Sequence, residues 1–509
     1  VFVPPDGSCY ECAMTERDYA LINLRYSCPM LGRGDVAEGK VPTTPTTAAG
    51  GERRLFGTDG VRGVAGETLT PELAVALGRA LVCAHGGRPR VLVARDTRLS
   101  GPMLASALAA GIAAAGGEAL LAGVLPTPAA AVVTPRLGLE FAAVISASHN
   151  PWQDNGIKFL GSDGTKIPDE LELAIEAQIE RGRASAPGAP AVAACADGGE
   201  VAGTTAPDPR AIGSVDTVDG ASGDYLRALE TRFGALDLSG LKVALDCANG
   251  ATWQTAPEIF RRLGAEVVTV GCAPDGTNIN ESCGSTHPDA IARAVVEQGC
   301  DIGFAFDGDG DRVVAVDRNG RVRDGDDIVA AIARSLHAAG ELAGGVAVTV
   351  MTNYGFHRAM RELGIEVAVT PVGDRHVLSA LLERGWMLGG EQSGHIIDRR
   401  FAATGDGTAS ALALLEALAG RDLATVETFE RMPQTLVNVP VRDRGALEGN
   451  AAVRAAVERW QSELADEGRV LVRASGTEPL VRVMVEASDR SRCEAVAAAL
   501  AEVVAAELG

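Results

Sequence analysis

Several features that would assign a protein to a class at once are missing from this sequence. No run of eighteen apolar residues occurs in its 509 positions, so we expect no membrane-spanning helix. Basic residues are in the minority, with 46 Lys and Arg against 67 Asp and Glu, and the net charge of −21 argues against nucleic acid as a partner. A small anionic substrate is still compatible, because a few Arg and Lys side chains can set the field inside one cleft.

Cysteine is also sparse. The ten cysteines are scattered without a dense framework, which favours a reducing cytosol. Cys9 and Cys12 have the spacing of half a zinc site and Cys28 is a candidate third ligand, but the lack of a fourth ligand nearby argues against zinc. The first thirty residues have no continuous apolar segment after a basic start, so we expect no secretory signal. Residues 1–51 end in a Pro- and Thr-rich tract. This pattern predicts an N-terminal extension that takes no part in catalysis or binding.

From residue 55 onward, short apolar runs alternate with amphipathic stretches. Hydrophobic residues reach 46% and aromatic residues only 4%, which predicts cores packed mainly by Ala, Val and Leu. The apolar runs, bounded by Gly, Asp or Asn, predict strands over 91–94, 141–145, 243–245, 302–306, 346–350 and 367–369. The periodic stretches predict helices over 71–84, 103–115, 288–298 and 327–338. This alternation predicts α/β layers with mostly parallel strands.

The last eighty residues follow a different pattern. Strands are predicted over 436–439, 470–472 and 481–485, and helices over 451–464 and 491–506, which indicates a small, mobile α+β module. A composition break at 184–222 is typical of an insertion or linker. We therefore predict three serial α/β domains with mostly parallel mixed sheets and a smaller C-terminal α+β domain. The predicted boundaries are 1–51 for the extension, 52–212 for the first domain with its insertion at 184–212, then 213–324, 325–428 and 429–509.

Residues 145–151 read Ile-Ser-Ala-Ser-His-Asn-Pro and follow directly on a predicted strand. A strand that ends at a polar turn can hold Ser148 at the open edge of a sheet, where α/β folds place their ligands. His149 and Lys158 supply positive charge beside it. Taken alone, the stretch is equally typical of a serine-rich turn.

Three carboxylates, Asp307, Asp309 and Asp311, follow another predicted strand at alternate positions with Gly between them. Each close pair repels by about 4 kcal/mol at an effective dielectric near 20, which is hard to tolerate without a cation or protonation. Oxygen ligands favour Mg²⁺, Mn²⁺ or Ca²⁺ over zinc. An EF-hand loop is excluded, because Arg312 and Arg318 stand where it needs Gly and Glu. The alternative is a solvated acidic turn.

Two Gly-flanked stretches are candidates for contacts with a sugar or an anion. Glu391 and Ser393 in Gly-Gly-Glu-Gln-Ser-Gly-His can bond vicinal sugar hydroxyls. His395 titrates near neutral pH, although a histidine in this setting is more often structural. The Gly-rich stretch 56–63 predicts a tight loop that presents Arg62, but this pattern alone does not point to one function.

A third polar loop joins two predicted strands of the last module. Arg473, Ser475, Gly476 and Thr477, with Arg482 beyond, combine guanidinium, hydroxyl and backbone donors in the manner of a phosphate cradle. The loop lacks Gly-Lys-Ser/Thr and is therefore not a nucleotide P-loop. The alternative is a polar hairpin turn.

Together and in this order, these stretches resemble the motifs of the α-D-phosphohexomutase superfamily. The resemblance is carried by residues 56–63, 146–158, 307–312, 391–395 and 473–479, and it spans 55–509. Gln392 makes the sugar loop similar to that of the bacterial phosphoglucosamine mutase branch, since phosphomannomutase/phosphoglucomutase relatives often carry Met there. The resemblance implies four domains around a central cleft, each contributing one motif.

By that resemblance, Ser148 becomes phosphoserine and one Mg²⁺ lies between it and Asp307, Asp309 and Asp311. The implied catalytic residues are Ser148, Arg62, His149, Lys158 and His395. The implied substrate-binding residues are Arg312, Glu391, Ser393, Arg473, Ser475, Gly476, Thr477 and Arg482. The general base is left open among Lys158, His395 and Arg62, although a guanidinium that stays protonated is better suited to stabilising charge.

The implied reaction interconverts glucosamine 6-phosphate and glucosamine 1-phosphate through a 1,6-bisphosphate that also primes the enzyme, and it feeds the synthesis of UDP-N-acetylglucosamine and cell wall. The alternatives are a phosphomannomutase/phosphoglucomutase, a metal-dependent phosphatase and a non-catalytic sugar-phosphate binding protein. The partner is a small phosphosugar, without nucleic acid or membrane. A cytoplasmic location is expected, with a homodimer and an activating kinase as candidate interactions.

Overall fold

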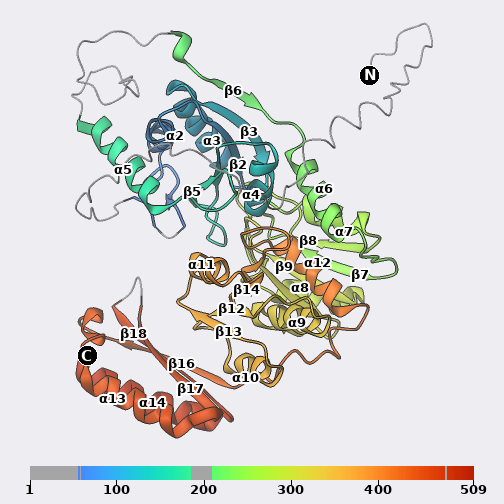
Figure 1. Ribbon diagram of the computed structural model, residues 1–509, viewed down its shortest axis with the longest axis vertical. Coiled ribbons are helices and arrows are strands. Elements are labelled where there is room, and N and C mark those ends of the chain that lie inside the picture. The colour runs from blue at the N-terminus through green and yellow to red at the C-terminus, as the bar shows by residue number, and fades with distance from the viewer. Residues whose placement is uncertain (1–54, 58, 185–208, 476–478) are drawn as a thin grey trace, which may run out of the picture. The chain divides into compact units, whose positions relative to one another are not determined.

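The strands of the protein form four separate sheets. The computed structural model describes residues 55–57, 59–184, 209–475 and 479–509, and Figure 1 shows the four sheets in chain order from blue to red. Three sheets are mixed α/β layers and the last is a smaller α+β layer, so the predicted fold class is confirmed. In the described part of the chain, no helix is long and apolar enough to cross a membrane.

The first sheet has the strand order β1-β5-β4-β2-β3-β6. Its strands are β1 (Val61–Val64), β2 (Arg90–Arg95), β3 (Glu118–Val124), β4 (Phe141–Ile145), β5 (Asp154–Gly161) and β6 (Ser214–Thr217). β4, β2, β3 and β6 run parallel. At the β4 edge, β5 pairs antiparallel with β4, and β1 pairs antiparallel with β5. β6 extends this sheet past residue 212, where the sequence places a domain boundary, and that boundary stays a prediction.

Successive residues of a strand face opposite sides, and this alternation gives the first sheet two cores. Val91 and Val93 share a core with α2 (Pro71–His85), α3 (Gly101–Ala114) and α5 (Asp169–Ala184). Leu92 and Ala94 pack instead with α4 (Thr127–Arg136). Thr70 caps the first of these helices by accepting from the Leu73 amide at 3.2 Å, which explains why it begins at Pro71.

The second sheet has the order β11-β10-β9-β7-β8. Its elements are β7 (Lys242–Asp246), β8 (Glu266–Val270), β9 (Ile302–Phe306), β10 (Val313–Asp317) and β11 (Val322–Arg323), with the helices α6 (Ala221–Phe233), α7 (Thr255–Arg262) and α8 (Asp289–Gln298). α8 packs on one face, and α6 and α7 belong to the core on the other. The antiparallel turn from β9 to β10 carries the three carboxylates at the carboxyl edge of the sheet.

The third sheet has the order β13-β12-β14-β15. Its elements are β12 (Val346–Thr349), β13 (Val367–Thr370), β14 (Leu388–Gly390) and β15 (Ile396–Asp398), with the helices α9 (Gly325–Ala338), α10 (Tyr354–Glu362), α11 (Asp374–Arg384) and α12 (Gly407–Leu418). α11 covers one face, whereas α9, α10 and α12 contribute to the core on the other. That core is continuous with the α4 face of the first sheet and with the second sheet, so the first three layers share one hydrophobic interior.

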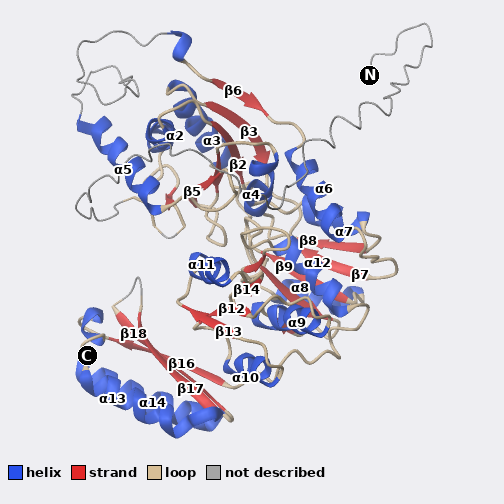
Figure 2. Ribbon diagram, viewed as in Figure 1, coloured by secondary structure: helices blue, strands red, loops and turns tan. Residues whose placement is uncertain are grey.

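The fourth sheet has the order β16-β18-β17 and is antiparallel throughout. Its strands are β16 (Gln434–Pro440), β17 (Gly468–Ala474) and β18 (Leu480–Ala487), and its helices are α13 (Ala451–Leu464) and α14 (Arg490–Leu508). Figure 2 shows the two helices side by side along one face of this sheet, where they enclose a separate core.

Most predicted elements match the structure to within a few residues. The sequence analysis missed the antiparallel strands β5 and β10, because both follow polar loops that were assigned to chemistry rather than to structure. It also missed α12, an Ala- and Leu-rich helix that is almost completely buried and has no polar face. The N-terminal extension with Cys9, Cys12 and Cys28, and most of the 184–212 insertion, lie outside the described residues.

Candidate active site

Ser148 lies in the turn that follows β4, at the carboxyl edge of the first sheet, as the sequence predicted. Its backbone has a φ of +52°, in the left-handed region that residues other than Gly seldom adopt, and only 3% of its surface is exposed. Its amide donates to the Ser146 hydroxyl at 3.0 Å, which in turn donates to the Asp96 carboxylate at 2.6 Å. This conformation turns the Ser148 hydroxyl away from the first domain and toward the second.

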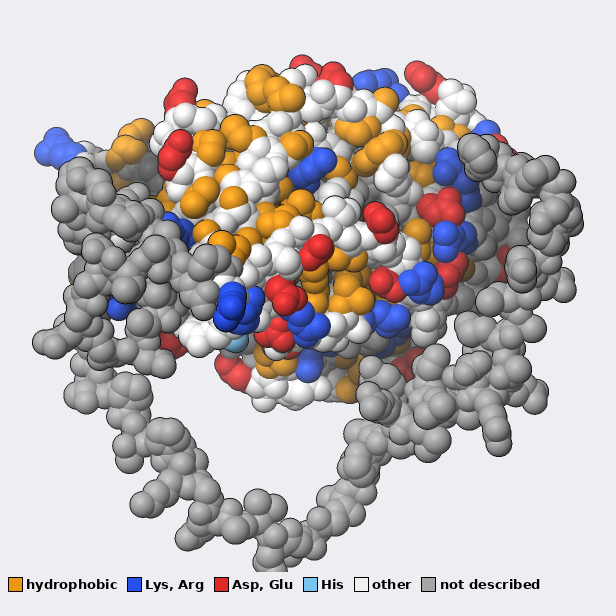
Figure 3. All heavy atoms as spheres, turned by 90° about the horizontal axis from the view of Figure 1, so that it is seen from above, with side chains coloured by type: hydrophobic (Ala, Val, Ile, Leu, Met, Phe, Trp, Pro, Cys, Tyr) orange, Lys and Arg blue, Asp and Glu red, His pale blue; other side chains and the backbone are white. Residues whose placement is uncertain are grey.

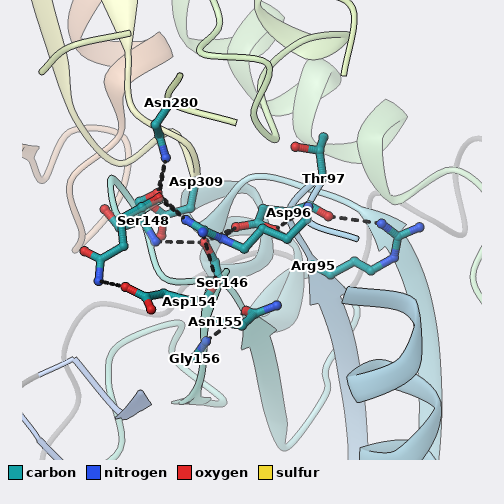
Figure 4. A network of polar contacts seen from close by, with 12 residues as sticks. Arg95, Asp96, Thr97, Ser146, Ser148, Asp154, Asn155, Gly156, Asn280 and Asp309 are labelled. Carbon is teal, nitrogen blue, oxygen red and sulfur yellow. Dashed lines mark hydrogen bonds and ion pairs between the residues drawn. The ribbon is translucent and has the colours of Figure 1, made fainter. Parts of the chain in front are cut away.

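The turn is held by Arg98, a fully buried guanidinium. Figure 4 shows the polar network around Asp96, Ser146 and Ser148. Arg98 pairs with Asp96 through an Nε–Oδ2 distance of 2.8 Å. Its remaining donors reach backbone carbonyl oxygens of the turn and of β5, namely those of Ser148, Asn150, Pro151 and Asp154. One side chain thus fixes four peptide groups around the reactive serine.

The Ser148 hydroxyl donates to Oδ2 of Asp307 at 2.5 Å, which joins the first domain to the acidic loop after β9. One oxygen from each of Asp307, Asp309 and Asp311 lies within 4.8 Å of the others, and all three residues are buried. Oδ1 of Asp309 and Oδ1 of Asp311 are buried without a hydrogen-bond partner. Buried, unpartnered carboxylate oxygens beside a hydroxyl suit a hard divalent cation such as Mg²⁺.

The electrostatics of this loop also indicate a cation. Burial, followed by the charges of Asp311 and Asp309, raises the pKa of Asp307 well above its ordinary value. Burial alone would raise the pKa of Asp309 as well, but Lys158 at 3.1 Å and Thr127 at 2.6 Å outweigh it and lower that pKa. One lysine therefore compensates part of the triad, and without a cation the ionised form of Asp307 is the least favoured of the three.

Lys158 lies on β5 and contacts the triad, whereas the sequence analysis expected its positive charge beside Ser148. Its ammonium is 3.1 Å from Asp309 and 3.8 Å from Asp311. Burial would lower the pKa of Lys158, but the charges of these two carboxylates outweigh it and raise the pKa. A lysine held in this way stays protonated, so it stabilises negative charge and is a poor proton acceptor.

His149 differs from its expected role as a positive charge. Its Nδ1 lies 3.3 Å from the Ser148 hydroxyl. Burial, and then the charges of Arg312 and Arg62, lower the pKa of His149, which favours the neutral ring at pH 7. Arg62 on β1 reaches Asp59 at 3.3 Å, and its effect on His149 places it at the same site.

The third domain adds His395 and Glu391 beside the acidic loop of Asp307, Asp309 and Asp311, which we call the metal loop. The Val313 amide donates to the Gly394 carbonyl at 3.0 Å, and His395 Nδ1 lies 3.7 Å from Asp311. Burial would lower the pKa of His395, but Asp311 outweighs it and raises the pKa to about 9. The Gly405 amide donates to Nε2 at 3.1 Å and so favours the neutral ring. That single bond contributes about 1 kcal/mol against about 4 kcal/mol for the charge pair, so the raised pKa prevails.

The remaining predicted residues near this loop are Glu391 and Ser393 of the third domain and Arg312 of the second. Glu391 is 8% exposed and accepts from the Gly373 amide at 2.9 Å. Ser393 is exposed, so its hydroxyl is accessible to a ligand. Arg312 is half-buried, and its Nε lies 3.9 Å from Asp311. These side chains share one neighbourhood with the metal loop.

The predicted phosphate cradle lies in the fourth domain, at the loop between β17 and β18. Arg473 and Arg482 face each other in register across the two strands, and Ser475 is buried at the loop. Gly476 and Thr477 lie outside the described residues. Burial, and then the like charge of Arg482, lower the pKa of Arg473, so the two guanidiniums lie close enough to repel each other.

Several residues of the site escaped the sequence analysis. Asp96 and Arg98 follow β2 at the same carboxyl edge as Ser148, so the position of that strand exit was an available signal. Thr127, at the start of α4, donates to Asp309, and Asn280 in a loop of the second domain donates to the Ser148 carbonyl. No motif distinguishes these two residues, since their roles arise only where two domains meet.

Four family models match the chain in sequence order. They describe phosphoglucomutase/phosphomannomutase alpha/beta/alpha domains I, II and III and the C-terminal domain, and they match residues 53–186, 223–320, 324–436 and 436–503. The chain belongs to the phosphoglucomutase/phosphomannomutase family. This membership explains why Ser148, the acidic loop, the Glu391 loop and the Arg473 hairpin each lie in a different domain.

Relatives within the family are similar over most of their length. A phosphoglucosamine mutase of Heliobacterium modesticaldum is 48% identical over 459 residues, covering 88% of this chain and 99% of the relative. One of Rubrobacter xylanophilus is 50% identical over 467 residues, covering 90% and 99%. A phosphoglucomutase/phosphomannomutase family structure from Burkholderia thailandensis has a TM-score of 0.72 at 26% identity and covers 89% of this chain and 97% of its own. The predicted membership of the phosphohexomutase superfamily is confirmed.

Proposed function

We propose that the protein is a phosphoglucosamine mutase that interconverts glucosamine 6-phosphate and glucosamine 1-phosphate through phosphorylated Ser148. The observation that carries the proposal is the contact between the Ser148 hydroxyl and Asp307, because it joins the group that would carry the phosphoryl to three clustered carboxylates. The amino-sugar substrate is supported by relatives named phosphoglucosamine mutase at 48% and 50% identity.

The reaction transfers one phosphoryl group out and one back. In the first half, the bond from Ser148 Oγ to phosphorus breaks and a bond from the sugar O1 to phosphorus forms, while the O1 proton passes to a base and the freed Ser148 oxygen takes up a proton. The resulting 1,6-bisphosphate turns end for end. In the second half, the bond from the sugar O6 to phosphorus breaks and the bond to Ser148 Oγ forms again, while the Oγ proton passes to a base, O6 takes up a proton and glucosamine 1-phosphate is left. Phosphoryl transfer of this kind depends mainly on positioning and on charge neutralisation.

Asp307, Asp309 and Asp311 would hold Mg²⁺, which offsets the roughly −1.5 to −2 charge of phosphoserine when it is bound. Lys158 and Arg312 add fixed positive charge from the protein. Of the groups around Ser148, neutral His149 at 3.3 Å combines reach with a free ring nitrogen, and it is our candidate proton acceptor. The raised pKa values of Lys158 and His395 make both weaker candidates than the sequence suggested.

Parallel kinetics test the proposal. The full chain, primed with glucose 1,6-bisphosphate, is given glucosamine, glucose and mannose 6-phosphates, and kcat/KM is measured for each together with the free phosphate released. We expect the highest kcat/KM for glucosamine 6-phosphate and no stoichiometric release of phosphate. A preference for glucose or mannose 6-phosphate would transfer the assignment to phosphoglucomutase/phosphomannomutase, and phosphate release equal to substrate consumed would make the protein a phosphatase.

Further features of the proposed function follow from the resemblance alone. The 1,6-bisphosphate as priming intermediate, a cytoplasmic location, a homodimer and an activating kinase stay predictions. The acidic composition and the mixture of charges are compatible with a small-molecule partner. On the face shown in Figure 3, acidic and basic side chains are interspersed with hydrophobic ones and form no patch of one sign.

A further inference from the structure

The junction between the first and second domains concentrates residues with uncommon backbone conformations. Of the seven described non-glycine residues with positive φ, five lie in its loops: Ser148, Ala248, Asn249, Asn280 and Ser282. Such conformations cost about 1–3 kcal/mol each and persist only where the surroundings over-determine them. The clustering therefore indicates that the loops of this junction are held in fixed conformations.

Asn280 occupies the centre of this junction. Its side chain is 7% exposed, and its amide nitrogen donates to the Ser148 carbonyl at 2.9 Å and to the Asn150 carbonyl at 3.1 Å. Figure 4 shows it reaching down from the second domain to the serine turn. Its own backbone is held by a bond from its amide to the Ala248 carbonyl at 2.9 Å.

The metal loop is packed against the same point. A Cβ added at Gly308, between Asp307 and Asp309, would lie 2.5 Å from the Ser148 carbonyl oxygen and 2.8 Å from the Asn280 amide nitrogen. Serine turn, metal loop and Asn280 thus meet without room for one more carbon atom. A shift of Asn280 changes where the serine turn rests on the metal loop.

Arg98 and Asn280 donate to the same two carbonyl oxygens, of Ser148 and Asn150, but they come from different domains. Arg98 belongs to the first domain and fixes the shape of the turn. Asn280 belongs to the second domain, so its bonds fix the position of the turn relative to the carboxylates. Without the Asn280 side chain, we expect the turn to keep its shape and to lose its fixed position relative to the carboxylates.

We propose that Asn280 is a positioning residue that registers the Ser148 turn on the metal loop and so sets the alignment for phosphoryl transfer. This inference rests on the proposed function. A misplacement of about 1 Å at a reacting group can cost about 100-fold in rate, so loss of two aligning hydrogen bonds is expected to act on kcat more than on KM.

Two substitutions test this role without straining the backbone, because Asp and Gly both tolerate a left-handed φ. Asn280→Asp keeps the shape and loses both donated hydrogen bonds, and Asn280→Gly removes the side chain. Asn249→Asp is the matched control, because Asn249 also has a positive φ of 48°. Its side chain donates to the Asn278 carbonyl and the Cys283 sulfur and accepts from the Ala273 amide, all within the second domain, and the contact from Thr97 of the first domain reaches its backbone carbonyl, which the substitution keeps.

The measurements are steady-state kcat and KM, the single-turnover rate of phosphoryl transfer from phosphorylated enzyme to glucosamine 6-phosphate, and Tm. For both Asn280 variants we expect kcat and the single-turnover rate to fall together by about 10- to 100-fold, with KM within about threefold. For Asn249→Asp we expect both rates within about threefold of the unmodified chain. Equal rates in the Asn280 and Asn249 variants would overturn the proposal, as would failure of both Asn280 variants to fold.

Hydrogen exchange of the segment 146–156 separates this inference from the proposed function. If the unmodified chain does not interconvert phosphosugars, the proposed function is wrong. The hydrogen-exchange comparison would still test whether Asn280 holds the turn. We expect faster exchange of this segment in Asn280→Asp than in Asn249→Asp. Identical exchange in the two variants would show that Asn280 does not hold the turn.

Discussion

The junction around Ser148 and the hairpin that carries Arg473 are built in opposite ways. The junction is buried, and residues of two domains donate to the same carbonyl oxygens, while a hydroxyl–carboxylate contact joins the two loops. The arginines of the hairpin are half-buried and oppose each other on neighbouring strands. The first arrangement favours one fixed geometry, whereas the second places two like charges side by side, where the proposed function would bind a substrate phosphate.

The fourth domain is attached at the end of its sheet away from that hairpin loop. Arg469 donates to the Thr352 carbonyl of the third domain at 2.6 Å, and Asn353 donates to Glu486 at 2.9 Å. Arg469 precedes Arg473 by four residues, which corresponds to about 13 Å along a strand. A small rotation at this attachment would therefore move the arginines by a larger distance, which the proposed reaction could use when its 1,6-bisphosphate turns end for end. The following predictions test the contrast between the proposed chemistry at a fixed junction and the proposed phosphate binding at the hairpin.

The largest effect is expected at the junction. Ser148→Ala removes the oxygen that would carry the phosphoryl group, and loss of a nucleophile typically costs about 10⁴-fold or more in kcat. Mutase activity and intact-protein mass, before and after incubation with glucose 1,6-bisphosphate, check this: a gain of one phosphoryl group is expected in the unmodified chain and none in the variant. Substantial residual activity in Ser148→Ala would remove Ser148 from the mechanism.

Asp307→Asn should separate metal binding from folding. The pKa of Asp307 is raised in the folded protein, so in the metal-free state its ionisation destabilises the fold as pH rises above about 4. Neutral Asn should therefore raise the Tm of metal-free protein at pH 7, abolish the rise in Tm that Mg²⁺ gives the unmodified chain, and lower activity by about 10- to 100-fold or more.

A metal-free Asp307→Asn protein that melts below the unmodified one would contradict the unbalanced charge inferred for this loop. Asp301→Asn is a suitable control, because Asp301 is also an aspartate of the second domain but accepts only from the Lys242 amide and pairs with Arg318 outside the site. It should leave the response to Mg²⁺ unchanged.

On the hairpin, Arg473→Gln should raise KM by about 10- to 100-fold, because one charge-assisted phosphate contact is worth about 1.5–3 kcal/mol. The single-turnover rate at saturating substrate should change by less than about threefold, since Arg473 lies away from the reacting atoms. The same substitution removes a like-charge pair and should stabilise the fourth domain slightly. A fall in the single-turnover rate as large as that of a junction variant would erase the contrast between the two regions.

The smallest effects concern two histidines of the third domain, the buried His395 and the half-buried His357. His395, with a pKa raised to about 9, contributes stability that is fully present below about pH 6.5 and is lost as pH rises through about 9. His357 lies near the fourth-domain attachment, where burial and then Arg469 lower its pKa to about 4, so its contribution is lost as pH falls from about 6.5 toward 4.

Urea unfolding of metal-free protein from pH 4 to 10 should show these opposite slopes. His395→Gln should flatten the alkaline limb and leave the acidic one, and His357→Gln should do the reverse. A His395→Gln protein with an unchanged alkaline limb would mean that the Gly405 bond, and not Asp311, decides the state of that ring.

Much of the fold was predictable because its signals are local. Strands such as β4 and β9 are short apolar runs that end at Gly, Asp or Ser, and both begin and end where the sequence placed them. The order of the motifs was sufficient to indicate the family, and the alternating aspartates were sufficient to indicate a cation. Local chemistry also led to the proposals for Ser148 and Arg473, because a hydroxyl at a strand exit and nearby guanidiniums suggest chemistry before any contact is known.

Only the tertiary structure decided how these groups act on one another. The neutral state of His149 depends on burial and on Arg312, and the locked charge of Lys158 depends on Asp309 and Asp311, all more than a hundred residues away in sequence. The raised pKa of Asp307 depends on burial together with Asp309 and Asp311 of its own loop. The roles of Asn280 and Thr127 exist because two domains meet at one carbonyl and one carboxylate. Residue type sets which proton or hydrogen bond is available, and long-range packing sets its energy.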